Sequence, residues 1–306
     1  MKIRILGSAA GGGFPQWNCN CRNCHGVRNG SVRARPRTQS SIAVRGDAED
    51  AWALVNASPD ILQQLHSHPD LQPAIGPRDS AIRAIILMDG QVDHTTGLLM
   101  LRESAQPWPL WCTDAVNDEL RQELPLLEVL SHYCGIDRRS IGTTDEWFAM
   151  DDIDGVEWRA TALQSKAPPY SRDRERQRAG SNVALTIRDT HSMRSVFYAP
   201  GLGAMTAGLW EAMRQSDLVL IDGTCWSDDE LIDLGVSCRR ARDMGHLPLS
   251  GPGGMLEWLD RLPAATRTVL VHINNTNPIL DEDSPQRAEL HARGIEVAYD
   301  GMEWTT

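Results

Sequence analysis

Three cysteines near the start of the sequence are spaced to bind one metal ion. Cys19, Cys21 and Cys24 form a C-x-C-x-x-C cluster in "QWNCNCRNC". Zinc prefers thiolates and takes four ligands in a closed structural site. The fourth ligand could be His25, which is adjacent in sequence, or a distant His or Asn. The alternatives are three unrelated thiols, a disulfide or a catalytic thiol. Thiolates held by zinc would not act as nucleophiles.

The total number of cysteines bears on the compartment of the protein. There are 7, which cannot all pair within the chain, and the four outside the cluster are scattered. This pattern suits a reducing compartment better than a secreted disulfide framework. Met1 leads directly into "KIRIL", without the apolar stretch of a signal peptide. We therefore expect a cytoplasmic protein.

Carboxylate and imidazole groups gather at the end of one apolar stretch. In "AIILMDGQVDHTTGL", residues 84–98, a predicted strand ends at Asp89, and Asp93 and His94 follow before a helix. Polar side chains after a strand can form a site at the edge of a sheet. Asp93 and His94 could offer a carboxylate and an imidazole to one ion, with Asp89 near enough to join them. The alternative is that Asp93 caps the helix and His94 faces solvent.

Two later apolar stretches end with the same residue types. Asp222 follows "DLVLI", and His272 follows "TVLV" and precedes Asn274 and Asn275. His246 lies in "DMGHLPLSGPGG", a loop before a predicted helix. Each of these residues alone is more often a turn or capping residue than a ligand. Together they indicate a site built from separate parts of the chain.

The glycines before the cysteine cluster resemble part of a dinucleotide-binding loop. "GSAAGGGFP" follows a predicted strand at 2–7, but the spacing G-x-G-x-x-G is only loosely met. Pro15 and the cysteines also leave no room for a helix of ordinary length directly after it. A tight turn with positive φ angles is the better explanation.

The elements that must position these residues alternate between short strands and helices. This order is typical of an α/β fold with a mixed sheet or two packed sheets. Strands are predicted at 2–7, 41–44, 52–57, 83–88, 110–112, 156–163, 182–188, 195–199, 217–222, 268–273 and 295–300. Helices are predicted at 60–67, 95–103, 114–122, 206–216, 229–234, 252–261 and 284–293.

Length and charge exclude some classes of protein. The chain has 306 residues, enough to bury a large core without disulfides. Its formal net charge of −11 argues against a general nucleic-acid binder, which needs a basic face. No stretch approaches the roughly 20 apolar residues that cross a membrane. We expect neither a nucleic-acid partner nor a membrane partner.

One segment departs from the composition of the rest. Residues 165–182, "SKAPPYSRDRERQRAGSN", are rich in Pro and Arg and lack apolar periodicity. The segment is either a solvated surface loop or a mobile flap that brings cations to an anionic substrate. The cations concerned are Lys166, Arg172, Arg174, Arg176 and Arg178.

Long motifs resemble a known family. "MDGQVDHTTG" is similar to the H-x-H-x-D-H element of the metallo-β-lactamase superfamily, with Asp89 and Gln91 in place of the first two His. "SAAGGGFPQWNCNCRNC", "SKAPPYS", "DGTCW", "MGHLP", "HINNTNPIL" and "GIEVAYDGMEW" resemble the PqqB family of pyrroloquinoline quinone (PQQ) biosynthesis proteins. The resemblance covers essentially the whole chain. It implies an αββα sandwich formed by residues 1–306 as a single domain, with the site at one edge of the sheets.

The resemblance also implies two metal sites. The cysteine cluster would hold a structural Zn2+. A related phosphodiesterase completes such a site with a His at the position of Asn275, so Asn275, His25 or water remains the fourth ligand here. The residues of a dinuclear zinc hydrolase are largely replaced, since Lys166 and Pro200 stand where His and a bridging Asp are needed.

The groups that remain are two His and carboxylates, which suit non-haem Fe(II) and O2. His94 and His272 are the expected imidazole ligands of Fe2+, with Asp93 the expected carboxylate. Asp222 and Asp89 are further ligands or orient a His. His246 is a candidate proton donor or substrate contact, and Lys166 is expected to bind a substrate carboxylate.

The function implied by the resemblance is iron- and O2-dependent hydroxylation of the tyrosine ring of a crosslinked Glu–Tyr intermediate in PQQ biosynthesis. One alternative is a non-enzymatic carrier involved in transport of PQQ or its precursor, and another is a residual zinc hydrolase. The expected partners are this small-molecule substrate and O2, with a homodimer as a further possibility.

Overall fold

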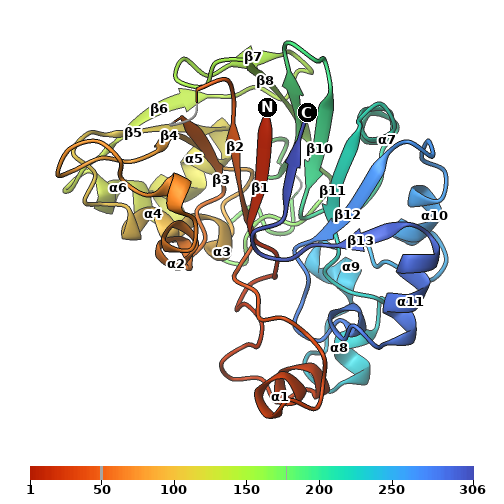
Figure 1. Ribbon diagram of the computed structural model, residues 1–306. Coiled ribbons are helices and arrows are strands. Elements are labelled where there is room, and N and C mark those ends of the chain that lie inside the picture. The colour runs from red at the N-terminus through yellow and green to blue at the C-terminus, as the bar shows by residue number, and fades with distance from the viewer. Residues whose placement is uncertain (49–50, 177) are drawn as a thin grey trace.

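The protein consists of two seven-stranded β-sheets packed face to face with helices on both outer sides (Figure 1). The computed structural model describes residues 1–48, 51–176 and 178–306. The predicted αββα sandwich is therefore confirmed. The first and last strands, β1 and β14, are neighbours, so the two ends of the chain lie together at the top of the view in Figure 1.

The two sheets have matching layouts, each with an antiparallel half and a parallel half. The first sheet has the order β14-β1-β2-β3-β4-β5-β6 and the second β13-β12-β11-β10-β9-β8-β7. The first contains β1 (Lys2–Gly7), β2 (Ser41–Arg45), β3 (Trp52–Val55), β4 (Ile82–Ile86), β5 (Trp108–Cys112), β6 (Ile136–Ser140) and β14 (Glu303–Thr305). The second contains β7 (Phe148–Ala149), β8 (Val156–Ala162), β9 (Val183–Asp189), β10 (Ser195–Ala199), β11 (Leu218–Asp222), β12 (Arg267–Val271) and β13 (Ile295–Val297).

The helices are short and cover the outer faces of the two sheets (Figure 1). On the first sheet lie α2 (Ile61–His66), α4 (Gly97–Met100), α5 (Asp114–Asp118) and α6 (Leu126–Leu130), and on the second α7 (Ala207–Arg214), α10 (Met255–Leu259) and α11 (Pro285–Ala292). The others are α1 (Arg22–Asn29), α3 (Val92–Thr95), α8 (Glu230–Asp233) and α9 (Ala241–Met244), with single turns at Pro69–Leu71, Glu119–Glu123 and Pro278–Leu280. Among the described residues, none of these helices is long and apolar enough to cross a membrane.

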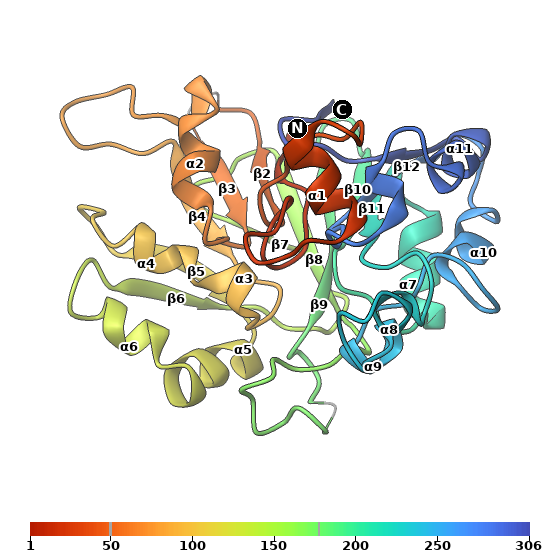
Figure 2. The ribbon, with the colours of Figure 1, turned by 90° about the horizontal axis from the view of Figure 1, so that it is seen from below.

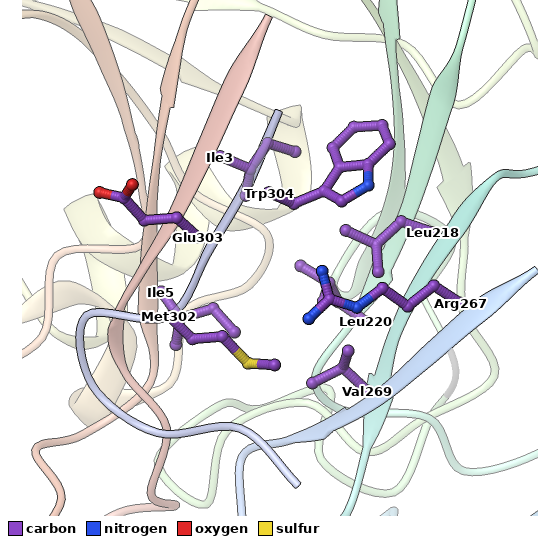
Figure 3. A pocket seen from close by; sticks show the side chains of 9 residues that line it. All are labelled: Ile3, Ile5, Leu218, Leu220, Arg267, Val269, Met302, Glu303 and Trp304. Carbon is purple, nitrogen blue, oxygen red and sulfur yellow. The ribbon is translucent and has the colours of Figure 1, made fainter. Parts of the chain in front are cut away.

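The central core lies between the two sheets. Strand β11 shows how it is built, because Leu218 and Leu220 face the other sheet while Val219 and Ile221 face the helices. A strand covered on both sides is apolar throughout, which explains the uninterrupted run "LVLI". Near β1 and β14 the apolar side chains of the two sheets leave a cavity of about 10 Å³ (Figure 3). That is room for one water molecule at most.

The ends of three strands, β4, β11 and β12, bring the candidate ligands together. Strands β3 and β4 run parallel, as do β10, β11 and β12, so their carboxyl ends share one edge of the sandwich. In Figure 2, which looks at this lower edge, α3 of the first half lies centrally, with α8 and α9 of the second half to one side. The segments that follow β4, β11 and β12 carry the candidate ligands.

The elements that the sequence did not predict have physical reasons. Strand β6 is a largely polar edge strand, and β7 and β14 are only two and three residues long. Helix α1 contains Gly26 and two polar asparagines, and it begins inside the cysteine cluster with Cys21 as its N-cap. Strand β12 ends at Val271 rather than at 273, because His272 adopts a φ of 53° that a strand cannot continue.

The inter-sheet core predicts the effect of one cavity-forming substitution. Leu185 in β9 is completely buried between the sheets, whereas Leu234 is 50% exposed. We expect Leu185→Ala to lower the free energy of unfolding by about 2–5 kcal/mol. Leu234→Ala should change it by less than about 0.5 kcal/mol. Urea unfolding curves of both variants test this, and equal losses would contradict the assignment of the core.

Candidate metal centres

His94 and Asp93 lie on α3, just beyond the end of β4. The segment between β4 and α3 is short, and the carboxylate of Asp89 folds back onto the ring of His94. Asp89 Oδ1 accepts a hydrogen bond from the backbone N–H of Gln91 at 2.9 Å and lies 2.8 Å from His94 Nδ1. His94 is 2% exposed, so its ring is fixed by packing as well as by Asp89. The alternative of a solvent-facing His94 is therefore wrong.

His272 reaches the same place from the second sheet. It follows β12 directly and adopts the left-handed backbone conformation, with φ at 53°. This conformation costs energy in a residue other than Gly and is found where surrounding contacts enforce it, often at functional sites. The rings of His94 and His272 meet edge to face, with 5.3 Å between their centroids.

The ring nitrogens of the two histidines face one carboxylate. Asp93 Oδ2 lies 3.8 Å from His94 Nε2 and 3.5 Å from His272 Nε2, and the potential ligand atoms all lie within 4.8 Å of one another. His94 Nε2 is buried and has no hydrogen-bond partner among the described residues. An unpartnered buried nitrogen aimed at a carboxylate and a second imidazole fits a metal ion bound between them.

The carboxylates and imidazoles of this group stabilise one another's charged forms. Burial alone would lower the pKa of His94, but the carboxylates of Asp89 and Asp93 raise it to about 9. Burial acts to raise the pKa of Asp93, but His94 and His272 bring it well below its ordinary value. With its raised pKa the ring of His94 is protonated on both nitrogens at neutral pH, and a bound metal ion would replace the proton on Nε2, which faces Asp93, while Nδ1 keeps its hydrogen bond to Asp89.

Asp222 supports the second histidine through Thr224. Oδ1 of Asp222 accepts hydrogen bonds from the backbone N–H and the hydroxyl of Thr224, at 2.9 and 2.6 Å. Its Oδ2 accepts from the backbone N–H of Leu202 at 2.9 Å and lies 2.7 Å from His246 Nδ1. The Thr224 hydroxyl in turn lies 2.9 Å from His272 Nδ1, which directs His272 Nε2 toward Asp93. Both oxygens of Asp222 are occupied, so this geometry suits a group that orients His246 and His272.

His246 stands beside the candidate ligands. Its ring stacks on that of His272 with 5.4 Å between centroids, and it lines the cavity described below. Burial would lower the pKa of His246, but the neighbouring Asp222 carboxylate raises it. Asp222, His246 and His272 also form a second group with ligand-like spacing.

A cavity of about 270 Å³ opens over the two histidines and is bordered by two arginines. Arg174 and Arg239 line it, and no ion pair of either is found within the described residues. Burial lowers the pKa of Arg174, and the charge of Arg239 lowers it further, so the two guanidinium groups repel one another. An anionic ligand in the cavity would relieve this repulsion.

Among the described residues of 165–182, no other cation lines this cavity. Gln177 lies outside the described residues. Lys166 does not line the cavity. Its ammonium lies 2.9 Å from the carboxylate of Glu175. The other pairs are Arg172 with Glu123 at 2.7 Å and Arg178 with Asp118 at 2.6 Å, and Arg176 is exposed. The expected contact of Lys166 with substrate has no support in this geometry, and Arg174 is the cation that the loop delivers.

The cysteine cluster folds as the spacing predicts. The three Sγ atoms of Cys19, Cys21 and Cys24 lie within 4.8 Å of one another. The side-chain amide of Asn275 reaches all three, at 3.0, 3.7 and 3.3 Å respectively. His25 is exposed and contacts Asn20 instead. Of the two side chains considered for the fourth position, only Asn275 faces the sulfur atoms.

The thiols repel one another as anions when no cation lies between them. Burial and the nearby thiols of Cys19 and Cys24 raise the pKa of Cys21 to about 11. A bound zinc ion would remove this cost, because it takes its ligands as thiolates.

The glycines before the cluster form the turn that the sequence predicts. Gly12 and Gly13 have φ angles of 92° and 69°, which favour glycine. Gly11 lines the cavity, and a Cβ atom there would lie 3.2 Å from Asp93 Oδ2. The turn thus borders the candidate iron ligands, a role that the sequence did not reveal.

Sequence reasoning missed Thr224 and Arg239. Thr224 stands two residues after Asp222 in "DGTCW", where a hydroxyl at a strand end is a weak signal by itself. Arg239 belongs to "CRRARD", a basic stretch that resembles any solvated surface segment. Only the fold shows that α9 and the loop before it turn Arg239 toward the histidines.

Comparison with known proteins places the chain in a family. A model of the beta-lactamase superfamily domain matches residues 51–273. Coenzyme PQQ synthesis protein B of Azoarcus sp. (strain BH72) is 63% identical over 302 residues, covering 99% of each chain. The protein of the same name from Cupriavidus necator is 60% identical over 301 residues, covering 98% of each.

Solved structures agree with this relationship. The crystal structure of Zn2+-bound PqqB from Methylobacterium extorquens aligns over 100% of both chains with a TM-score of 0.91 and 38% identity. A diphosphatase of the PhnP family aligns with a TM-score of 0.66 at 16% identity, which is a likeness of fold alone. By overall identity, matching length and shared fold, the chain belongs to the coenzyme PQQ synthesis protein B (PqqB) family of the beta-lactamase superfamily.

Proposed function

We propose that the protein is an Fe(II)-dependent oxygenase of PQQ biosynthesis that hydroxylates the tyrosine ring of a crosslinked Glu–Tyr intermediate. The observation that carries this proposal is the group formed by Asp93, His94 and His272 at the floor of the cavity. Two imidazoles and one carboxylate with open positions are the ligands of many non-haem iron oxygenases. Family membership supports a role in PQQ synthesis.

The side chains around the proposed iron site have distinct tasks. Bound iron would supply the activation of O2. Asp89 holds the Nδ1 proton of His94, and Thr224 holds that of His272, so both rings present Nε2 to the ion. His246 has its Nδ1 fixed by Asp222, which leaves its other nitrogen to donate a proton within the cavity.

The cavity suits a substrate that carries carboxylates. Arg174 and Arg239 provide two cations without ion pairs among the described residues, on the same cavity as the histidines. The guanidinium group pairs with a carboxylate through two parallel hydrogen bonds, which fixes orientation as well as charge. A Glu–Tyr amino acid bound in this way would place its ring toward His94 and His272.

We further propose that Cys19, Cys21 and Cys24 hold a structural zinc ion with Asn275 as the fourth ligand. The amide of Asn275 can present its oxygen after a half-turn of the side chain, since the two amide atoms are nearly isosteric. Asn23 anchors the same loop by donating hydrogen bonds to the backbone oxygens of Asn275 and Asn277.

Anaerobic loading with Fe(II), followed by O2, tests the oxygenase. With the crosslinked Glu–Tyr amino acid and ascorbate as reductant, wild-type protein should add one oxygen atom from ¹⁸O2 to the ring for each turnover. The double variant His94→Ala, His272→Ala should lose more than ~100-fold of this rate, because the imidazole ligands are gone. Mass spectrometry of the product measures both outcomes.

The matched control is His132→Ala, which removes an exposed histidine and should keep full activity. An absence of oxygenated product from wild-type protein, or equal activity in the double variant, would contradict the proposal. Binding and hydrolysis assays on the same variants separate the alternatives. A carrier binds PQQ without turnover, and a zinc hydrolase cleaves esters or phosphodiesters without O2.

Arg239→Gln tests the recognition of the substrate. Because the side chain lies at the mouth of the cavity, its loss should raise KM about tenfold, or ~1.4 kcal/mol, and leave kcat nearly unchanged. Arg240→Gln is the control, since the neighbouring Arg240 pairs with Asp229 at 2.8 Å and does not line the cavity. Equal effects of the two substitutions would show that only the general charge of this surface matters.

Cys21→Ser tests the structural zinc. We expect the variant to lose the zinc bound at this site and to melt at a lower temperature, because the loop of Asn275 is no longer held. Cys238→Ser, which removes an exposed thiol, should change neither property. Metal analysis and thermal unfolding of both variants are the measurements. Retention of zinc by Cys21→Ser would disprove the ligand assignment.

A further inference from the structure

A second cavity lies away from the candidate metal centres and is rich in arginine. It has a volume of about 220 Å³ and is bordered by α11, β13 and the segment that precedes β2. It shares no lining residue with the cavity over the histidines. Its charged and titratable lining consists of Arg35, Arg37, Arg287, His291, Glu282 and Glu296, with the phenol of Tyr299 alongside.

The two acids of this lining are already paired, Glu296 with an arginine outside the lining and Glu282 with Arg33 and with Arg35 of the lining. Glu296 accepts hydrogen bonds from the guanidinium of Arg267, which is not part of the lining, at 2.5 and 3.0 Å. Glu282 lies 3.4 Å from Arg33 and 3.6 Å from Arg35. Neither acid lies within 4 Å of Arg37 or Arg287, judged over the described residues. The positive charge of the cavity therefore exceeds what its own carboxylates neutralise.

Arg37 is the most unusual member of the lining. It is only 6% exposed, and its Nε is buried without a hydrogen-bond partner in the described part of the chain. Its Nη1 donates to the backbone oxygen of Arg35 at 2.9 Å. The nearby Asp300 attracts Arg37, but its two oxygens already accept four hydrogen bonds from Ser8 and Thr38. A buried guanidinium with an unused donor is costly unless a ligand or water accepts from it.

Arg287 is the third arginine of the lining. Its Nη1 donates to the backbone oxygen of Ile279 at 3.1 Å, and no ion pair is found for it over residues 1–48, 51–176 and 178–306. Burial lowers its pKa, Glu282 acts in the opposite direction, and the charge of Arg35 lowers it again. Burial likewise lowers the pKa of Arg37 to about 10, and the charges of Arg287 and Arg35 add to the effect while Asp300 and Glu282 oppose it. The positive charges of Arg35, Arg37 and Arg287 thus repel one another.

The size of the cavity limits what it can hold. Its neighbour, the apolar cavity of Figure 3, shares Met302 with it but has a volume of only about 10 Å³. An apolar tail therefore has no space beyond Met302. The arginine cavity itself, at about 220 Å³, has room for a small polar anion with some water.

We propose that the cavity lined by Arg35, Arg37 and Arg287 binds a small oxyanion, either a phosphate or a carboxylate group. The guanidinium fork matches the oxygens of both groups and can bind two of them at once. The anion would accept from Arg37 Nε and balance the charges of Arg287 and Arg35. The ring of Tyr299, 5.1 Å from the Arg35 guanidinium, holds that side chain at the rim.

Calorimetric titration of the zinc-replete full chain tests this site, with inorganic phosphate and succinate as separate probes at constant ionic strength. At least one probe should bind saturably to the wild-type protein. Arg287→Gln and Arg35→Gln should each raise its Kd by about tenfold or more. Tighter binding of phosphate than of succinate would identify a phosphate ligand, and the reverse order a carboxylate.

Two control variants keep the result specific. Arg33→Gln removes a cation that pairs with the same Glu282 but lies outside the cavity, and it should leave Kd unchanged. Arg239→Gln weakens anion binding at the metal cavity and should also leave this Kd unchanged. Failure of both probes to bind overturns the proposal. So does a loss of binding in Arg33→Gln equal to that in Arg287→Gln, or a loss confined to Arg239→Gln.

Arg35 is mostly exposed, with 64% of its side chain open to solvent, so Arg35→Gln should fold normally. Circular dichroism of Arg287→Gln confirms its fold before titration. Should Arg287→Gln fail to fold, Arg35→Gln alone decides the matter, because an unchanged Kd in that variant contradicts the proposal.

Discussion

The buried carboxylate of Asp222 is the constraint on which the second half of the candidate metal centre depends. It is completely inaccessible, and its oxygens bind the backbone of Leu202, both donors of Thr224 and the ring of His246. Through Thr224 the same carboxylate sets the direction of His272. A charge buried this deeply is tolerated only with several donors, so the loops after β10, β11 and β12 are held in one arrangement.

Asp89 has the corresponding role in the first half of the protein, since its carboxylate holds Nδ1 of His94. Each sheet thus brings an imidazole together with its own supporting carboxylate, and Asp93 lies between the two rings. This division follows from the matching layouts of the sheets, whose parallel strands end at a common edge. The candidate centre therefore lies between the two halves of the chain, and each half supplies some of its ligands.

Many of the strands could be predicted from the sequence, because uninterrupted apolar runs such as "LVLI" are typical of a strand that is buried on both faces. The edge strand β6, with Ile136 its main apolar residue, carries no such pattern. For the site, the strand-end residues His94 and His272 were predictable from their positions. The contributions of Thr224, Arg239 and Gly11 were not, because a hydroxyl, a surface arginine and a turn glycine acquire their meaning only from neighbours distant in sequence.

The position of Asn275 links the two candidate metal sites along the chain. It lies three residues after His272, in a loop that Asn23 of α1 and the cysteine cluster fasten to the body of the protein. The backbone strain at His272 is thus sustained from one side by β12 and from the other by the cluster. Under the proposed ligand assignments, a change at the cysteine cluster would reach His272 through only three residues of backbone.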